Sequence, residues 1–182
     1  MTGLKNDYFN EDVYIMLEQL DSQTLRHCIR VANIAKQVQK ELSLSEDLYN
    51  AAMVHDIGKI YISNNILNKP QKLNQLERNI VNLHSYFGFR ILKNLNVSDD
   101  ICYIILFHHG KNVLTLENIP LCNNPEILNY AHMLHTIDSY EALTSDRVFR
   151  KRFTREKALE IMESEGGHQK QVMDLFKNVR IL

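Results

Sequence analysis

Apolar residues recur along almost the whole chain at helical spacing, three or four positions apart. No convincing run of alternating apolar and polar residues indicates a β-strand. The pattern therefore predicts an all-α fold, a single compact bundle of about seven to eight helices. The predicted helical segments are residues 11–20, 22–42, 45–56, 74–95, 99–109, 125–143, 155–163 and 169–178.

Capping residues mark the ends of several of these segments. Asn74 and Glu77 form a variant of the capping box, in which each side chain bonds the other residue's backbone. Asn124 is followed by a proline at the first helical position, where proline is favoured. Gly110 is suited to the end of segment 99–109. Two stretches, 61–72 and 111–123, are predicted to be loops. Other predicted N-caps are Ser98 and Thr154.

The composition supports helices joined by short connections. The 182 residues include only 6 glycines and 3 prolines, which leaves few tight turns for a β-sandwich or barrel. The length suits one domain with a sizeable core. We expect a helical extension over residues 1–21, a main domain over 22–165 and a short C-terminal helix within 166–182 that packs on the same domain.

Charge and cysteine content exclude several function classes. A net charge of −1 provides no basic field for duplex nucleic acid. The three cysteines show no CxxC spacing, so a disulfide scaffold or a thiolate zinc site is not expected. The longest uncharged apolar run, residues 101–109, is too short to span a membrane, and the first residues contain no apolar signal segment. These observations predict a cytoplasmic protein without membrane contact.

Eight histidines are the unusual feature of this composition. A single histidine on an apolar helix face is ordinarily a core residue with a hydrogen-bond partner. Here five histidines and an aspartate fall on the inner faces of the predicted helices, and burying them without partners would cost several kcal/mol in total. A metal centre with nitrogen and oxygen ligands would satisfy them. They are His27, His55, His84, His108, His109 and Asp138.

The adjacent pair His55-Asp56 is the sharpest element of this set. Neighbouring residues on a helix point about 100° apart, so the pair serves one ion best at a helix end, which Gly58 would permit. The same holds for His108-His109 before Gly110.

In their order and spacing these residues resemble the HD phosphohydrolases, with the HD-GYP phosphodiesterases as the nearest subgroup. The likeness covers roughly residues 22–165. Its motifs run H-x2-R-V-A at 27–32, A-A-x-x-H-D-I-G-K-I at 51–60, H-x3-G at 84–88, H-H at 108–109 and I-D-x-x-x-A-L-T-S-x-R at 137–147.

The resemblance implies a metal-dependent phosphohydrolase with two divalent ions. A histidine-rich site bridged by a carboxylate suits Fe, Mn, Ni, Co or Zn. One ion would be held by His27, His55, Asp56 and Asp138. Asp56 would also bridge to a second ion, held by His84, His108 and His109, and Lys59 would lie beside the scissile phosphate. Two ions about 3.5–4 Å apart can clamp the attacking and leaving oxygens. Arg147 and Arg150 match positions that contact substrate phosphates.

The chain also departs from the subgroup's pattern. The GYP signature is missing after the HH pair, where only Ile119-Pro120 remains. Gln23 occupies the place of a glutamate found in members with a third ion, which favours two ions. Glu141 replaces the second aspartate of a D-x-x-D pair, and a Gly-x-x-Phe-Asp-Pro stretch is replaced at residues 166–170. Specificity for cyclic di-GMP therefore does not follow from the resemblance.

The sequence predicts hydrolysis of a phosphodiester in a nucleotide or cyclic dinucleotide. The alternative is a catalytically weak or inactive signalling or adaptor module that retains the metal ions, with a protein partner or a homodimer left open. A metal-free bundle would need every inner histidine to be satisfied by hydrogen bonds alone. The other three histidines are predicted at the surface or its boundary, and His168 is predicted to be exposed. Of these, His135 lies one turn before Asp138 and could support the ligands.

Overall fold

The structure is a computed structural model and describes residues 8–110, 122–146 and 150–179. Within these ranges all regular elements are helical, apart from one isolated bridge residue at Arg150. The helices are α1 (Glu11–Glu18), α2 (Ser22–Leu42), α3 (Asp47–Val54), η1 (Ile57–Tyr61, a 3₁₀-helix), α4 (Asn64–Leu67), α5 (Gln75–Asn82), α6 (His84–Asn94), α7 (Asp99–Phe107), α8 (Pro125–Thr144), α9 (Arg155–Glu165) and α10 (Lys170–Asn178). The all-α prediction is confirmed.

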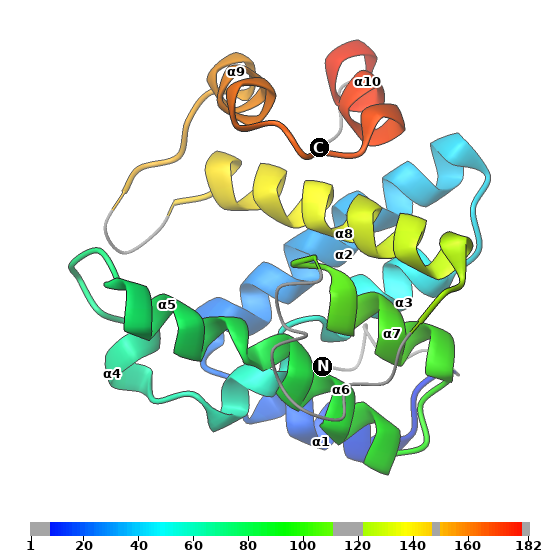
Figure 1. Ribbon diagram of the computed structural model, residues 1–182, viewed down its shortest axis with the longest axis vertical. Coiled ribbons are helices and arrows are strands. Elements are labelled where there is room, and N and C mark those ends of the chain that lie inside the picture. The colour runs from blue at the N-terminus through cyan, green and yellow to red at the C-terminus, as the bar shows by residue number, and fades with distance from the viewer. Residues whose placement is uncertain (1–7, 111–121, 147–149, 180–182) are drawn as a thin grey trace.

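The long helix α8 runs through the middle of the molecule (Figure 1). On one side it packs against α2, α3 and α7, and on the other against α9 and α10. Residues from all the described helices except α4 and α5 share one core, which includes Val13 of α1, Val31 of α2, Leu134 of α8 and Phe176 of α10. None of the helices in the described ranges has the length and apolarity needed to cross a membrane.

The capping predictions agree with the structure. Asn74 and Glu77 form a capping box at the start of α5, with both reciprocal bonds present. Asn124 accepts a bond from the Glu126 backbone N–H at the start of α8, and Pro125 is the first helical residue. The other two predicted N-caps are Ser98 and Thr154, which accept backbone bonds at the starts of α7 and α9.

Two predicted elements were wrong. The segment 74–95 is not one helix, because the backbone turns at Leu83 (φ −68°, ψ −12°) and separates α5 from α6. Helix α5 contributes no buried residue to the core, although the apolar spacing of the segment includes Ile80. The predicted loop 61–72 contains the short helix α4, which begins after the capping residue Ser63. These changes account for the two α-helices found beyond the predicted number. The other predicted loop covers residues 111–123, of which 111–121 lie outside the described residues.

Candidate metal centre

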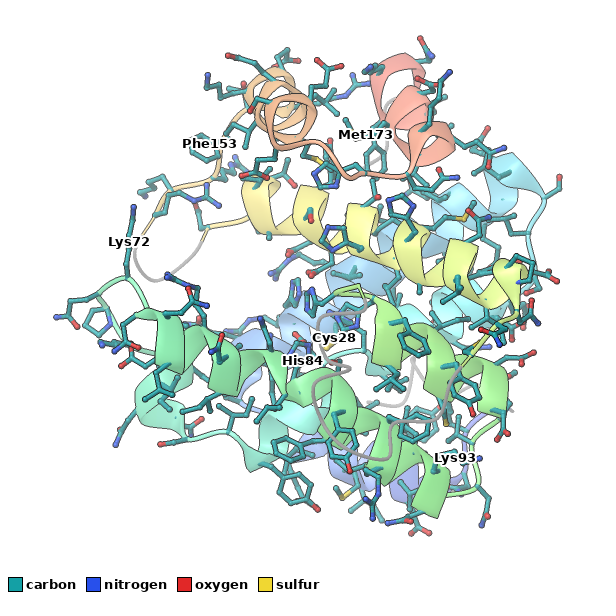
Figure 2. The ribbon with its side chains drawn as sticks, viewed as in Figure 1. Cys28, Lys72, His84, Lys93, Phe153 and Met173 are labelled. Atoms are coloured by element: carbon teal, nitrogen blue, oxygen red, sulfur yellow. The ribbon has the colours of Figure 1, made fainter. Side chains whose placement is uncertain are left out.

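Three inner histidines lie where one helix ends or another begins. His55 is the C-cap of α3 and His108 is the C-cap of α7. His84 is the first residue of α6, directly after the turn that ends α5. All three side chains are buried. His84 lies near the centre of the molecule, in the region where Cys28 of α2 also lies (Figure 2).

Each of these three rings is oriented by the same kind of hydrogen bond. The Nδ1 atoms of His55, His84 and His108 lie 2.6–2.7 Å from the carbonyl oxygen three residues earlier, in the last turn of α3, α5 or α7. A carbonyl oxygen only accepts, so each Nδ1 carries the proton. Carbonyl oxygens in the last turn of a helix have no backbone N–H within the helix to bond them. Here the Nδ1–H groups of the rings donate those hydrogen bonds. Each Nε2 is therefore unprotonated and carries a lone pair. The carbonyls belong to Ala52, Val81 and Ile105.

One cluster of possible ligand atoms joins α2 to the end of α3. His27, His55 and Asp56 each offer a ligand atom, and these atoms lie within 4.8 Å of one another. Asp56 Oδ2 is 3.6 Å from Nε2 of both histidines. Asp138 of α8 completes the group, with Oδ1 2.9 Å from His27 Nε2 and 4.0 Å from His55 Nε2.

A second cluster lies on the opposite side of Asp56. It consists of His84, His108 and His109, again with ligand atoms within 4.8 Å of one another. Asp56 Oδ1 is 3.3 Å from His84 Nε2, so the two oxygens of this carboxylate face different clusters. The structure thus brings together all seven residues that the sequence singled out as metal ligands.

The buried rings are neutral and present unprotonated nitrogens that a cation could bind. Burial, together with neighbouring histidines or Lys59, lowers the pKa of His84 and of His108 to about 3, so both rings are neutral at pH 7. Their Nε2 atoms are 3.4 Å apart, and each is unprotonated and carries a lone pair. His55 Nε2 is buried and has no hydrogen-bond partner among the described residues. Converging lone pairs beside a carboxylate can be satisfied by a metal ion.

His27 differs from the other rings because both of its nitrogens face carboxylates. Burial opposes its charged form, but hydrogen bonds with Asp138 and Glu141 outweigh burial and raise the pKa of His27 to about 9. A metal bound at Nε2 would therefore displace a proton from this ring. Nδ1 lies 2.5 Å from Glu141 Oε2, and this bond fixes the orientation of the ring.

Glu141 is a functional residue that the sequence analysis missed. It was noted only as a departure from a D-x-x-D pair, yet it is buried and bonds to His27, Arg30 and Ser145. The spacing of residues in the sequence could have indicated this role of Glu141. Glu141 lies three residues after Asp138 and Arg30 lies three residues after His27, so each pair shares a helix face.

Replacing Glu141 with glutamine is expected to weaken metal binding 10- to 100-fold, as is typical for the loss of an outer partner of a ligating histidine. It should also lower the free energy of unfolding of the chelator-treated protein by about 2 kcal/mol, because the bonds to charged partners weaken. Metal titration and urea unfolding test both effects. Glu126→Gln on the exposed end of α8 is the control. Unchanged metal affinity in Glu141→Gln would contradict this role.

Lys59 extends from η1 to the same carboxylate. Its Nζ lies 2.6 Å from Asp56 Oδ2. Burial opposes the charged form of Lys59, but Asp56 outweighs burial and raises the pKa of Lys59, so this ammonium stays charged at pH 7. A fixed positive charge therefore lies at the edge of the first ligand cluster.

A cavity of about 370 Å³ opens beside this cluster. His27 and Lys59 line it, and so do the cationic side chains of Arg26 and Arg30. Arg30 also donates its Nε–H to Glu141. The cavity thus gives a ligand access to the metal centre along a wall with three cations.

The two arginines predicted to contact phosphate are placed differently. Arg147 lies outside the described residues. Arg150 donates to the carbonyls of Ala142, Leu143 and Lys151 and lies 4.3 Å from the centre of the Phe153 ring. Its guanidinium thus caps the end of α8, and its contact with a substrate phosphate stays a prediction.

Comparison with known proteins identifies the family. Residues 24–143 match the HD domain family. The chain belongs to the HD domain family. The family expected from the motifs is therefore confirmed, and Asp56 and the five inner histidines all lie within the matched residues.

The proteins similar to this chain include several phosphodiesterases. The chain is 34% identical to the 3'3'-cGAMP-specific phosphodiesterase 3 of Vibrio cholerae over 145 residues, which are 77% of this chain and 31% of that protein. It is 31% identical to the cyclic di-GMP phosphodiesterase PA4108 of Pseudomonas aeruginosa over 159 residues, 85% of this chain and 38% of that protein. The chain thus spans about a third of the length of these two curated relatives.

A solved structure has the same fold. The HD domain of the Listeria monocytogenes phosphodiesterase PgpH, in complex with cyclic-di-AMP, superposes with a TM-score of 0.64 over 96% of this chain and 87% of that one. The two sequences are 21% identical, so this likeness supports the fold alone.

Proposed function

We propose that this HD domain is a metal-dependent phosphohydrolase, a phosphodiesterase that hydrolyses a nucleotide or cyclic dinucleotide. One observation carries the proposal: imidazole nitrogens from α2, α3 and α6 lie 3.3–3.6 Å from the two oxygens of one buried carboxylate, Asp56, and the α6 histidine also clusters with the two histidines that follow α7. The names of the relatives, which are cyclic di-GMP and cGAMP phosphodiesterases, support this substrate class.

The ligand sets are proposed as follows. His27, His55, Asp56 and Asp138 would hold one divalent ion, and His84, His108 and His109, together with Asp56, would hold a second. The all-nitrogen-and-oxygen donor set suits Fe, Mn, Ni, Co or Zn. Two such ions, when bound, supply Lewis acidity toward the phosphoryl group and a nucleophile from water.

The chain's own residues then bind and orient the substrate. The Lys59 ammonium, held by Asp56, is placed to contact a phosphoryl oxygen and to stabilise the negative charge that develops on it. Arg26 and Arg30 line the adjoining cavity, where they can bind the remaining phosphate of a cyclic dinucleotide. Arg147 and Arg150 remain proposed phosphate contacts.

The test is hydrolysis by the purified chain after reconstitution with Mn²⁺, Fe²⁺ or Ni²⁺. The panel contains cyclic di-GMP, 3'3'-cGAMP, cyclic di-AMP and a chromogenic phosphodiester. We expect turnover of at least one cyclic dinucleotide to exceed that of the chelator-treated protein by more than about 100-fold, because the ions would supply several kcal/mol of stabilisation to the transition state.

A protein that contains metal ions but hydrolyses nothing on the panel would contradict the proposal. If that protein bound a cyclic dinucleotide stoichiometrically and released it intact, the alternative of a signalling or adaptor module would replace it. Chromatographic analysis of the bound ligand distinguishes these outcomes.

A further inference from the structure

A second group of histidines lies beyond the metal centre. His132 and His135 project from α8, and His168 lies in the connection between α9 and α10. The prediction that His168 is exposed was wrong. The side chain is partly buried, and its ring is nearly parallel to that of His135, with centroids 5.5 Å apart and an interplanar angle of 13°.

The chain holds His168 in place through bonds on both sides of it. His132 Nε2 donates to the carbonyl of Gly167 at 2.8 Å. The backbone N–H of Gln169 donates to Thr136 Oγ1 at 2.8 Å. Gly166 and Gly167 have φ values of 68° and 72°, which glycine adopts at low cost, and they turn the chain toward α8. The His135–His168 pair is therefore built by specific contacts.

Three nitrogens of this pair have no hydrogen-bond partner among the described residues. They are Nδ1 of His135 and both ring nitrogens of His168, and all three atoms are buried. A buried polar atom left without a partner destabilises the folded protein, so a ligand that bonds these nitrogens would be stabilising. The only other imidazole nitrogen in this condition within the described ranges is His55 Nε2, which belongs to the metal centre. Buried imidazole nitrogens without a hydrogen-bond partner thus occur both at the metal centre and at the His135–His168 pair.

The surroundings of the pair suit a cation. His135 lines a second cavity, of about 360 Å³, together with His108, His109 and His132. Burial lowers the pKa of His135 and of His168, so both rings offer lone pairs at pH 7. The charge of the Glu165 carboxylate acts on both rings. Imidazole nitrogens without partners are ligands that divalent transition metals favour, and the Glu165 carboxylate adds negative charge nearby.

We propose that His135 and His168, with Glu165 balancing the charge, bind a further divalent transition-metal ion beside the second cavity, separate from the metal centre around Asp56. This site lies next to the second ligand cluster, since the rings of His109 and His135 meet edge to face with centroids 6.0 Å apart. The inference goes beyond the proposed function and does not depend on hydrolysis.

The experiment counts bound metal ions. Wild-type protein, His135→Asn and His168→Asn are dialysed against Zn²⁺, and bound zinc is measured by mass spectrometry. Each variant is expected to bind one equivalent fewer than the wild type. His132→Gln is the matched control, because its amide can still donate to the Gly167 carbonyl, and it should bind as many ions as the wild type. Circular dichroism checks that each variant is folded.

A second measurement reports the site directly. The imidazole nitrogen signals of His168, assigned by their absence in His168→Asn, should shift in NMR spectra when Zn²⁺ is added to the wild type. The same shift is expected in Asp56→Asn, in which the metal centre is disrupted, so the result does not depend on the proposed function. Equal zinc content in all variants, or His168 signals that do not move at saturating Zn²⁺, would overturn the proposal.

Discussion

Replacing Asp56 with asparagine is expected to weaken binding at both ligand clusters by more than about 100-fold. The loss of an outer partner of a ligand already costs 10- to 100-fold, and Asp56 contributes an oxygen to each cluster directly. Its Oδ2 lies 3.6 Å from Nε2 of His27 and of His55, while Oδ1 lies 3.3 Å from His84 Nε2. The asparagine has the same shape but offers one oxygen and no charge. Hydrolysis should fall to the level of the chelator-treated protein.

Metal content and turnover of Asp56→Asn should be measured together with those of Lys59→Met. Lys59 contacts Asp56 but offers no lone pair while its ammonium is charged. Lys59→Met is therefore expected to retain the metal ions and lose about 100-fold or more in turnover. Asp56→Asn protein that retained both ions, with affinity near that of the wild type, would exclude a bridging carboxylate.

Much of the fold could be predicted because helix boundaries are encoded locally. The caps at Asn74, Ser98, Asn124 and Thr154 each depend on a side chain that bonds backbone within three residues of it. A sequence window of four residues contains all the information for such a bond. The starts of α5, α7, α8 and α9 therefore agree with their predictions.

The break at Leu83 could not be predicted because its cause is tertiary. Apolar spacing continues through residues 80–91, as in one helix. The chain instead turns so that the His84 ring can bond the Val81 carbonyl and α6 can pack against η1. A consequence is that Ile80 of α5 is only partly buried, despite its position in the pattern.

The clustering of the candidate ligand residues could be predicted because histidines and aspartates on apolar faces are costly to bury and follow a spaced motif. Their supporting partners could not. The donors and acceptors that orient the rings are backbone carbonyls, which every residue has, and Glu141, which comes from a helix far along the chain from His27. Only the packing of α2 against α8 brings these groups together.

Gly58 shows how a correctly noted residue can have a different role. The sequence analysis assigned it to the end of a helix. In the structure it lies within η1, where the backbone of α6 passes so close that no side chain fits. A β-carbon built on Gly58 would lie 2.0 Å from the His84 carbonyl oxygen and 2.4 Å from the Gly88 backbone nitrogen. The contact fixes η1, which carries Lys59, against the helix that begins with His84.

Replacing Gly58 with alanine is therefore expected to lower the free energy of unfolding by about 3 kcal/mol or more, at the upper end of the cost of overpacking. The atoms in the way are backbone, so η1 and α6 must move apart, and this separates Asp56 and Lys59 from His84. Metal affinity should fall with stability. Gly166→Ala is the control: its φ of 68° disfavours alanine, but nothing lies within 4 Å, so we expect a loss of about 1 kcal/mol and unchanged affinity at the metal centre. Urea unfolding and metal titration give both quantities, and a Gly58→Ala variant as stable as the wild type would show that this close packing is not required.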